Sequence, residues 1–167
     1  MNRRQFFFMA GTAASFSSLL AWLDGPVGAD TSMTDEKFPV TKTDEEWRRT
    51  LTPEQYRVLR KEGTERAGTS PLNAEKRKGT FYCAGCGAPL FSSETKFESG
   101  TGWHSFWKPL DKGVGQSVDR SWFMERTEVH CARCGGHLGH VFDDGPPPTG
   151  LRYCMNGVAM AFIPAAT

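Results

Sequence analysis

The alternation of apolar and polar residues divides the chain into three stretches. The first, residues 1–29, holds an apolar run that follows two arginines and continues, among small residues, to Leu23. The second, residues 30–42, is polar and lacks hydrophobic periodicity, which is typical of a linker. The third, residues 43–165, begins with helix signals and continues with short strand signals. We therefore predict a leader segment, a linker and one folded domain with these boundaries.

Two short helices are predicted at the start of the domain. Thr43 and Glu46 have the spacing of a capping box, in which each side chain binds the backbone amide of the other residue. Residues 52–55, with the sequence Thr-Pro-Glu-Gln, repeat this spacing and place proline at the first helical position. Gly63 is expected to end the second helix, because glycine readily adopts the left-handed conformation of a helix terminus.

From Thr80 onward the pattern changes to short apolar runs separated by turn residues. Aromatic and β-branched residues, which fit the pleated surface of a strand, dominate these runs. The runs are Phe81-Tyr82, Pro89-Leu90-Phe91, Trp103 to Trp107, Trp122-Phe123-Met124, Glu128-Val129-His130 and Val141-Phe142. The chain holds 18 glycines and 10 prolines, so frequent turns are expected between the strands. The domain is therefore predicted to be mainly β, with a compact antiparallel core.

Length and charge narrow the range of functions. A chain of 167 residues is long enough for one domain with a substantial core. The formal net charge is only +1, so there is no basic excess with which to neutralise phosphate groups. We therefore expect no nucleic acid partner.

The N-terminal stretch has the composition of an export signal. Arg3-Arg4 precedes the apolar run, no acidic residue occurs before Asp24, and Val27-Gly28-Ala29 offers the small residues that a signal peptidase reads. The paired arginines favour the twin-arginine route, which exports folded proteins; a Sec signal and an uncleaved membrane anchor are the alternatives. The run is short and rich in small residues, which argues against a permanent span. We predict an exported, periplasmic protein that meets the membrane only transiently through this segment.

Four of the five cysteines form two C-x-x-C pairs, Cys83 with Cys86 and Cys131 with Cys134. Each C-x-x-C turn supplies two thiolates from one bend, and two such turns can close a tetrahedral metal site. We predict one structural Zn²⁺ per chain, loaded before export. The alternatives are iron in the same site, two disulfides, or a redox-active pair.

The fifth cysteine, Cys154, is the candidate nucleophile. Arg152, Cys154 and Asn156 are spaced by two, so a strand would project all three from one face and Tyr153 and Met155 from the other. A neighbouring guanidinium favours the thiolate, which is the nucleophilic form. The alternative is a buried and inert structural cysteine, the commoner environment of a free thiol, and the polar neighbours count against it.

Two of the four histidines, His137 and His140, lie on either side of a glycine. In a regular strand they would face opposite sides, so we expect a bulge at Gly139 to bring both to one site. We interpret them as proton donors or substrate-orienting groups, with Asp143 and Asp144 placed to orient an imidazole. The alternative is a pair of hydrogen-bonded core histidines.

Together these motifs resemble the B-type methionine sulfoxide reductases, which reduce the R epimer of methionine sulfoxide. The resemblance runs from about Trp47 to Phe162. It rests on residues 51–56, 63–65, 99–103, 137–146 and 152–156 and on both C-x-x-C turns. It implies an oxidoreductase with a β-rich "tent" of two antiparallel sheets and a zinc site away from the active site.

The resemblance also assigns roles to the candidate residues. Cys154 would attack the sulfoxide sulfur and become a sulfenic acid, while His140 supplies a proton to the oxygen. Trp103 would hold the S-methyl group of the substrate. The polar half of the site would be lined by His137, His140, Asp144, Arg152 and Asn156.

The chain departs from the family pattern at three positions. Thr101 stands where many relatives have a resolving cysteine, and the other four cysteines are assigned to metal, so an internal disulfide with Cys154 is not expected. An external thiol, provided by a thioredoxin-like protein of the envelope, would then reduce the sulfenic acid. His104 replaces a usual proline, and Gly157 replaces a usual serine.

The resulting hypothesis is a monomeric enzyme that repairs oxidised exported proteins or peptides. Two other classes compete with it. A zinc-stabilised binding module would have the same fold but no need of Cys154. A thiol-disulfide oxidoreductase that uses one C-x-x-C pair would keep its fold when metal is removed.

Overall fold

The computed structural model describes residues 38–121 and 124–166, which belong to the second of the two units into which the chain divides, Glu36–Thr167. The leader predicted at residues 1–29 lies outside the described residues, as do most of the predicted linker and Trp122-Phe123. Within the described ranges, no helix is long and apolar enough to cross a membrane.

Both predicted helices are present and begin at the predicted caps. α1 (Asp44–Thr50) and α2 (Pro53–Lys61) each have a threonine N-cap with the reciprocal bonds of a capping box. The end of α2 differs from the prediction, because Glu62 and not Gly63 adopts the left-handed conformation. Glycine is needed at position 63 for a close approach instead: a Cβ there would lie 2.8 Å from the carbonyl oxygen of Arg57.

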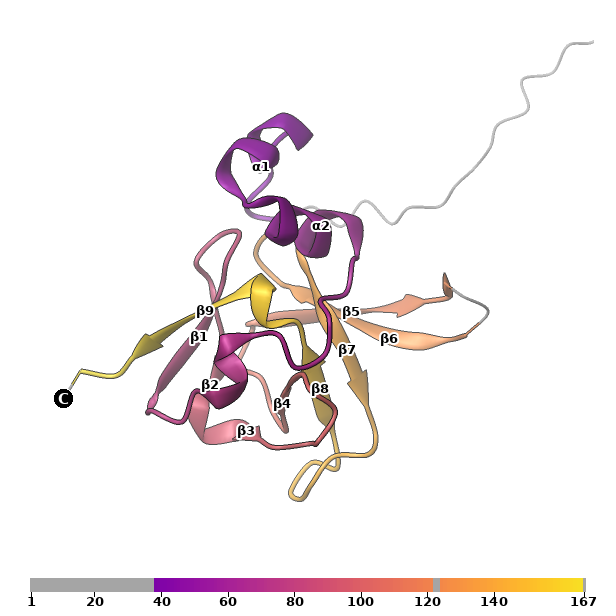
Figure 1. Ribbon diagram of the computed structural model, residues 1–167. Helices are drawn as coiled ribbons and strands as arrows, with labels where there is room; N and C mark the ends of the chain where they lie inside the picture. Colours follow the sequence, from indigo (N-terminus) through magenta and orange to yellow (C-terminus); the bar gives the residue numbers. More distant parts are fainter. Residues whose placement is uncertain (1–37, 122–123, 167) are drawn as a thin grey trace, which may run out of the picture. The chain divides into compact units, whose positions relative to one another are not determined.

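The strands form two antiparallel sheets, as predicted (Figure 1). The smaller sheet has the order β2-β1-β9. Its strands are β1 (Gly79–Cys83), β2 (Pro89–Ser92) and β9 (Met160–Pro164). The larger sheet has the order β3-β4-β8-β7-β6-β5. Its strands are β3 (Lys96–Phe97), β4 (His104–Phe106), β5 (Val114–Asp119), β6 (Arg126–Cys131), β7 (His137–Phe142) and β8 (Arg152–Met155).

Nearly all of the predicted apolar runs contain or lie within a strand. The exception is Trp122-Phe123-Met124, of which only Met124 is described, and it lies between β5 and β6. β5 is a strand that the apolar pattern does not predict, because its central residues 115–117, Gly-Gln-Ser, offer no alternation. Three 3₁₀ turns complete the elements used below: η1 (Pro71–Ala74), η2 (Ser93–Thr95) and η4 (Gly157–Ala159).

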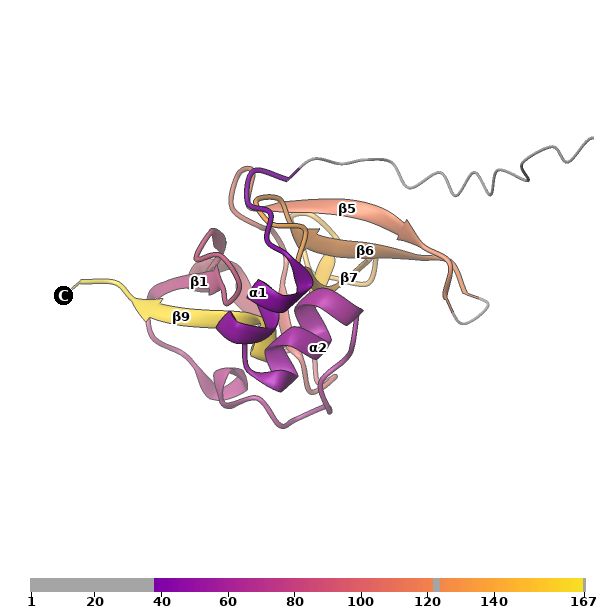
Figure 2. The same cartoon turned by 90° about the horizontal axis from the view of Figure 1, so that it is seen from above.

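One hydrophobic core joins the two sheets and the helices. Phe106 of the larger sheet stacks on Phe91 of the smaller one, with ring centroids 4.3 Å apart, and contacts Phe81 edge-on at 5.0 Å. Trp47 and Leu59 bring the two helices into the same core. α2 packs against η4 and against β7, the strand that carries His137 and His140 (Figure 2).

Residues 38–42, the end of the predicted linker, contact the folded domain. The ring of Phe38 meets His130 edge-on at 5.5 Å, and the amide of Val40 donates a hydrogen bond to the carbonyl of Arg133 at 2.9 Å. Gly135 leaves room for this docking, because a Cβ there would overlap the Phe38 ring. The last residues of the predicted linker therefore pack against the domain.

Candidate active site and metal centre

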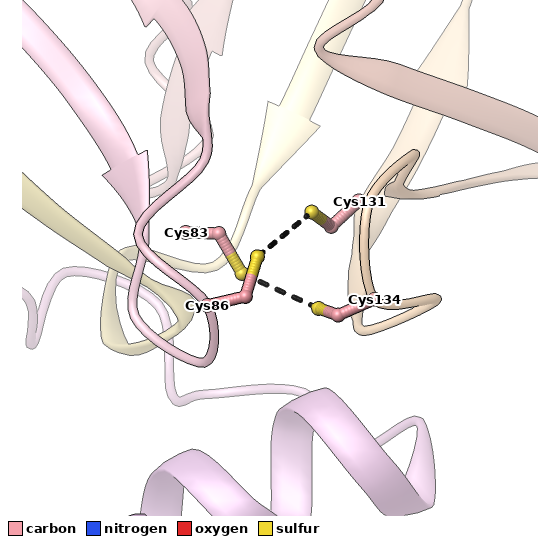
Figure 3. Close-up of side chains that lie close together, drawn as sticks. All are labelled: Cys83, Cys86, Cys131 and Cys134. Atoms are coloured by element: carbon pink, nitrogen blue, oxygen red, sulfur yellow. Dashed lines mark hydrogen bonds between the residues drawn. The ribbon is translucent and has the colours of Figure 1, made fainter. Parts of the chain in front are cut away.

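The two C-x-x-C turns face each other at the ends of different sheets. Cys83 is the last residue of β1 and Cys131 the last of β6, and each pair lies in the turn that follows its strand. Figure 3 shows the pairs opposite one another, with Cys83 Sγ 3.8 Å from Cys134 Sγ and Cys86 Sγ 3.6 Å from Cys131 Sγ. All four sulfur atoms lie within 4.8 Å of one another.

These distances fit a metal site better than disulfides. A disulfide places its sulfurs about 2.05 Å apart, whereas zinc thiolate bonds of about 2.3 Å place tetrahedral sulfurs about 3.8 Å apart. All five cysteines of the chain are free thiols. Neither pair begins a helix, which is the context of a thioredoxin-like redox motif. The four cysteines are therefore positioned to hold one metal ion, and they leave no ligand position open.

Cys154 lies at the centre of the larger sheet. Its strand β8 runs between β4 and β7, where Cys154 pairs with Ser105 on one side and His140 on the other. Tyr153 and Met155 point into the core and are only 5% and 0% exposed, so the predicted alternation of β8 is confirmed. Cys154 itself is half-buried on the opposite face.

A cavity of about 150 Å³ lies over Cys154. Its walls include four predicted residues, Trp103, His140, Cys154 and Asn156, together with Thr64, Arg126, Gly139 and Phe142. A larger cavity of about 540 Å³ lies elsewhere, between α2, η1 and η4, and none of the predicted site residues line it. The smaller cavity is therefore the candidate active site, because the predicted nucleophile and its neighbours line it.

Arg152 is held beside Cys154 by a carboxylate. Its Nε and Nη2 atoms donate hydrogen bonds to the two oxygens of Asp144, both at 2.8 Å. Its guanidinium also lies over the ring of Phe142, 4.6 Å from the ring centroid. Arg152 and Asp144 therefore act as one unit, in which the carboxylate fixes the cation next to the thiol.

The electrostatics of Cys154 differ from the expectation. Burial raises the pKa of the Cys154 thiol, and Arg152 together with the Thr101 hydroxyl opposes this shift without cancelling it. The guanidinium favours the thiolate, as predicted, but desolvation is the larger effect. The resting thiol is therefore protonated at neutral pH and has to lose its proton during the reaction.

A bulge in β7 brings the two histidines to one site. The extra residue is Leu138, between the positions at which His137 and Gly139 pair with β6. The rings of His137 and His140 consequently lie 5.4 Å apart, as the prediction required. Gly139 itself allows the close approach of β8, because a Cβ there would overlap the carbonyl oxygen of Cys154.

Two carboxylates from β5 and β6 contact these histidines. His140 Nε2 lies 2.8 Å from Asp119 Oδ2, and His137 Nδ1 lies 2.7 Å from Glu128 Oε1. From the sequence, Asp143 and Asp144, which directly follow β7, are expected to orient the imidazoles. Asp144 instead accepts a hydrogen bond from Arg152. Cross-strand neighbours are closer in space than residues beyond a strand end, so the pairing of β5, β6 and β7 decides the partners.

Asn156 holds the backbone around the site. Its Oδ1 accepts a hydrogen bond from the amide of Glu65 at 2.9 Å, and its Nδ2 donates to the carbonyl of Leu138 at 3.0 Å. The buried carboxylate of Glu65 in turn accepts hydrogen bonds from the amides of Gly157 and Val158 at 2.7 and 2.9 Å. Asn156 therefore links the 63–65 segment to β7.

Trp103 forms an aromatic wall of the cavity. Its Nε1 donates a hydrogen bond to the carbonyl of Glu65 at 3.2 Å, which fixes the orientation of the indole. Glu65 thus supports both Trp103 and the turn after Asn156, a role that sequence reasoning missed. A buried acidic residue cannot be recognised from sequence alone, because the backbone amides that donate hydrogen bonds to its carboxylate come from distant segments.

Comparison with known proteins agrees with these features. A family model described as the SelR domain matches residues 51–164. A protein of Leptospira interrogans named peptide methionine sulfoxide reductase MsrB is 58% identical over 126 residues, which cover 75% of this chain and 96% of the relative. Proteins of the same name from Agrobacterium fabrum and Methanosarcina barkeri are 54% identical over 134 residues and 57% identical over 124 residues. These alignments cover 79% and 74% of this chain and 99% and 87% of the relatives. The chain therefore belongs to the SelR domain family, which includes the MsrB peptide methionine sulfoxide reductases.

Proposed function

We propose that this chain reduces the R epimer of methionine sulfoxide in oxidised proteins and peptides, with Cys154 as the nucleophile. The chain is an oxidoreductase of the methionine sulfoxide reductase class. The proposed nucleophile and epimer preference rest on one cavity. It brings together Cys154, the indole of Trp103 and the imidazole of His140.

The proposed reaction has one redox step on the protein. The Cys154 sulfur attacks the electrophilic sulfur of the sulfoxide, and His140 delivers a proton to the sulfoxide oxygen. The sulfoxide is reduced to methionine, and Cys154 takes the oxygen as a sulfenic acid. Arg152, fixed by Asp144, stabilises negative charge on the Cys154 sulfur, and His137, fixed by Glu128, supports His140 from the side.

The two sides of the cavity account for the proposed epimer preference. Trp103 and Phe142 offer an apolar surface to the S-methyl group, whereas His140 and Arg126 offer donors to the oxygen. A sulfoxide of the opposite hand would exchange these two groups and leave a polar oxygen against an indole. The preference then arises from unequal binding of the two transition states.

We propose that an external thiol regenerates Cys154. Thr101, and not a cysteine, stands beside Cys154, and the other four cysteines form the metal site. Two thiols of a thioredoxin-like reductant would reduce the sulfenic acid to the thiol, with release of water and formation of a disulfide in the reductant.

The four-cysteine site suits one structural Zn²⁺ per chain. Zinc would be held by Cys83, Cys86, Cys131 and Cys134, whose all-sulfur set and spacing match its preference for tetrahedral thiolate ligands. Its contribution would be to folding, because it would tie the end of β1 to the end of β6.

The location and role in the cell rest on residues 1–29 alone, which lie outside the described residues. Their composition supports twin-arginine export to the periplasm, where a monomeric enzyme would repair oxidised exported proteins. Fusion of residues 1–42 to a folded reporter, expressed with and without the twin-arginine translocase, tests this. Export that does not depend on the translocase or on Arg3-Arg4 would contradict it.

The activity is tested with separated R and S epimers of peptide-bound methionine sulfoxide and dithiothreitol as reductant. We expect turnover of the R epimer only, and loss of activity in Cys154→Ser with an unchanged circular dichroism spectrum. Activity on the S epimer alone, or activity that survives Cys154→Ser, would overturn the proposal. Mass spectrometry after one turnover without reductant should show one added oxygen on Cys154 and no internal disulfide.

A further inference from the structure

Asp119 and Arg126 lie beside the candidate active site, and the reaction proposed above gives Asp119 no role. The two residues face each other across the β5–β6 ladder. One carboxylate oxygen, Asp119 Oδ2, lies 2.6 Å from Arg126 Nη2 and 2.8 Å from His140 Nε2. The side chains of Asp119 and His140 are only 15% and 13% exposed, so water competes weakly for these bonds. A guanidinium, a carboxylate and an imidazole thus form one connected chain.

The charge of Asp119 fixes the direction of its bond to His140. Burial by itself would raise the pKa of Asp119, but hydrogen bonds from Ser121, His140 and Arg126 hold that pKa far below its ordinary range. An ionised carboxylate can only accept hydrogen bonds. The hydrogen between Asp119 and His140 therefore belongs to His140 Nε2.

His140 is neutral in the resting site. Burial lowers its pKa more than Asp119 raises it, and the positive charge of Arg126 adds to the lowering. His137 on β7, whose ring lies 5.4 Å away, lowers the pKa of His140 as well. The other ionisable groups around His140 are Glu128 on β6, Cys154 on β8 and Glu62 after α2. A neutral imidazole carries one hydrogen, so with Nε2 protonated its Nδ1 atom is an acceptor.

The His140 ring borders two cavities. One, of about 110 Å³, is shared with Asp119, and the other, of about 150 Å³, lies over Cys154. We propose that Asp119 and Arg126 are positioning residues that hold His140 as the Nε2–H tautomer, so that Nδ1 is free to accept a proton from Cys154. This inference rests on the proposed function only in taking Cys154 as the nucleophile.

The arrangement explains where the proton delivered to the sulfoxide comes from. Cys154 is a thiol at rest, so its proton has to leave as the sulfur attacks. Nδ1 of His140 accepts that proton, and Asp119 stabilises the imidazolium that forms. His140 then gives the same proton to the sulfoxide oxygen and returns to the neutral state. The thiol proton and the sulfoxide oxygen both end on the Cys154 sulfenic acid, so no external proton is consumed.

The tautomer can be measured without turnover. Long-range ¹H–¹⁵N correlation spectra of protein labelled at histidine distinguish Nε2–H from Nδ1–H, with His140 assigned by His140→Gln. We expect the Nε2–H form in the wild type and a loss of this preference in Asp119→Asn. The same variant should lose about a hundredfold in kcat, which is the usual contribution of a general acid–base group. Asp111→Asn, an exposed acidic residue, is the matched control and should change neither quantity.

Arg126→Gln gives an independent measurement. Removal of the guanidinium should raise the pH at which His140 becomes protonated, so the acidic limb of the kcat profile should move upward toward about pH 6.5.

A wild-type Nδ1–H tautomer would overturn the proposal. So would an Asp119→Asn variant with an unchanged tautomer and pH profile and only a lower melting temperature, since that result identifies a structural brace. If Asp119→Asn does not fold, the pH dependence of kcat in Arg126→Gln tests the proposal instead, and an acidic limb at the wild-type pH would overturn it. A wild type with the Nε2–H tautomer but no sulfoxide reduction would overturn the proposed function and leave this assignment standing.

Discussion

The imidazole of His104 occupies the space that a side chain at position 157 would need. A Cβ on Gly157 would overlap His104 Cε1 and the hydroxyl of Ser70. His104 is 1% exposed and lies in β4 directly opposite Met155, two residues before Gly157. From the resemblance, a proline is expected at position 104 and a serine at position 157. The overlap shows that the side chains at these two positions compete for the same space, so a change at one is coupled to a change at the other.

This coupling predicts that Gly157→Ser is destabilising in this chain. The added side chain has to displace a fully buried ring, and overpacking of this kind costs about 1–3 kcal/mol. His104→Ala should relieve the part of that cost that comes from the imidazole ring, whereas the overlap with Ser70 remains, so the two substitutions should be partly non-additive in a double-mutant cycle. Urea unfolding of the four proteins measures this. Additive free energies would show that the two positions do not compete for space.

The sequence predicts those parts of the molecule that depend on local spacing. The capping boxes of α1 and α2, the two C-x-x-C turns and the alternation of β8 follow from residues within a few positions of one another. The carboxylates that hold the histidines do not follow from sequence, because Asp119 lies on a polar strand without alternation and meets His140 across β6. The sequence also places the histidine pair correctly but cannot identify Leu138 as the bulged residue.

The buried His104 also predicts a pH dependence of stability. Burial chiefly, with a contribution from Lys96, lowers the pKa of His104 to about 4. An unfolded chain has a histidine pKa of about 6.5, so the unfolded state binds more protons between about pH 4 and pH 6.5. The free energy of unfolding should therefore fall as the pH drops through this window, by about 3 kcal/mol in total, and should be fully retained above it.

His104→Gln isolates this effect from that of His140, whose pKa is also lowered by burial. The variant keeps a polar side chain of similar size but cannot be protonated. Urea unfolding at pH 7 and pH 4.5 should show a smaller loss of stability in the variant than in the wild type. An equal loss in both proteins would mean that His104 is protonated as readily in the folded state as in the unfolded one.

The four-cysteine site predicts that stability depends on metal. Purified protein should contain one zinc per chain, and a strong chelator should lower its melting temperature because the sulfurs join the ends of β1 and β6. Cys86→Ser should lose the metal, whereas Cys154→Ser should keep it. Elemental analysis and thermal unfolding measure both effects. Iron in place of zinc would appear as visible absorbance, and a fold that is indifferent to chelation would contradict a structural metal.

The last prediction concerns Thr101 and the pKa of the Cys154 thiol. Its hydroxyl lowers the pKa of the Cys154 thiol and so favours the thiolate. Behind it, Ser99 Oγ lies 2.8 Å from Thr101 Oγ1, and the buried hydroxyl of Ser105 donates to Ser99 Oγ at 2.8 Å. Ser99 accepts from Ser105, so its own hydrogen is available to Thr101, and the hydrogen of Thr101 is then left for Cys154.

Thr101→Val removes the donor and keeps the shape, so the pKa of the Cys154 thiol should rise further. Thr101→Ser retains the hydroxyl and should leave that pKa close to the wild-type value. The rate of alkylation of Cys154 by iodoacetamide as a function of pH measures the shift, because the thiolate is the form that reacts. Ser105→Ala should give a smaller shift in the same direction, because it removes a donor two hydrogen bonds away. Equal alkylation profiles for Thr101→Val and Thr101→Ser would mean that the hydroxyl does not stabilise the thiolate and that Thr101 only fills the position of the missing cysteine.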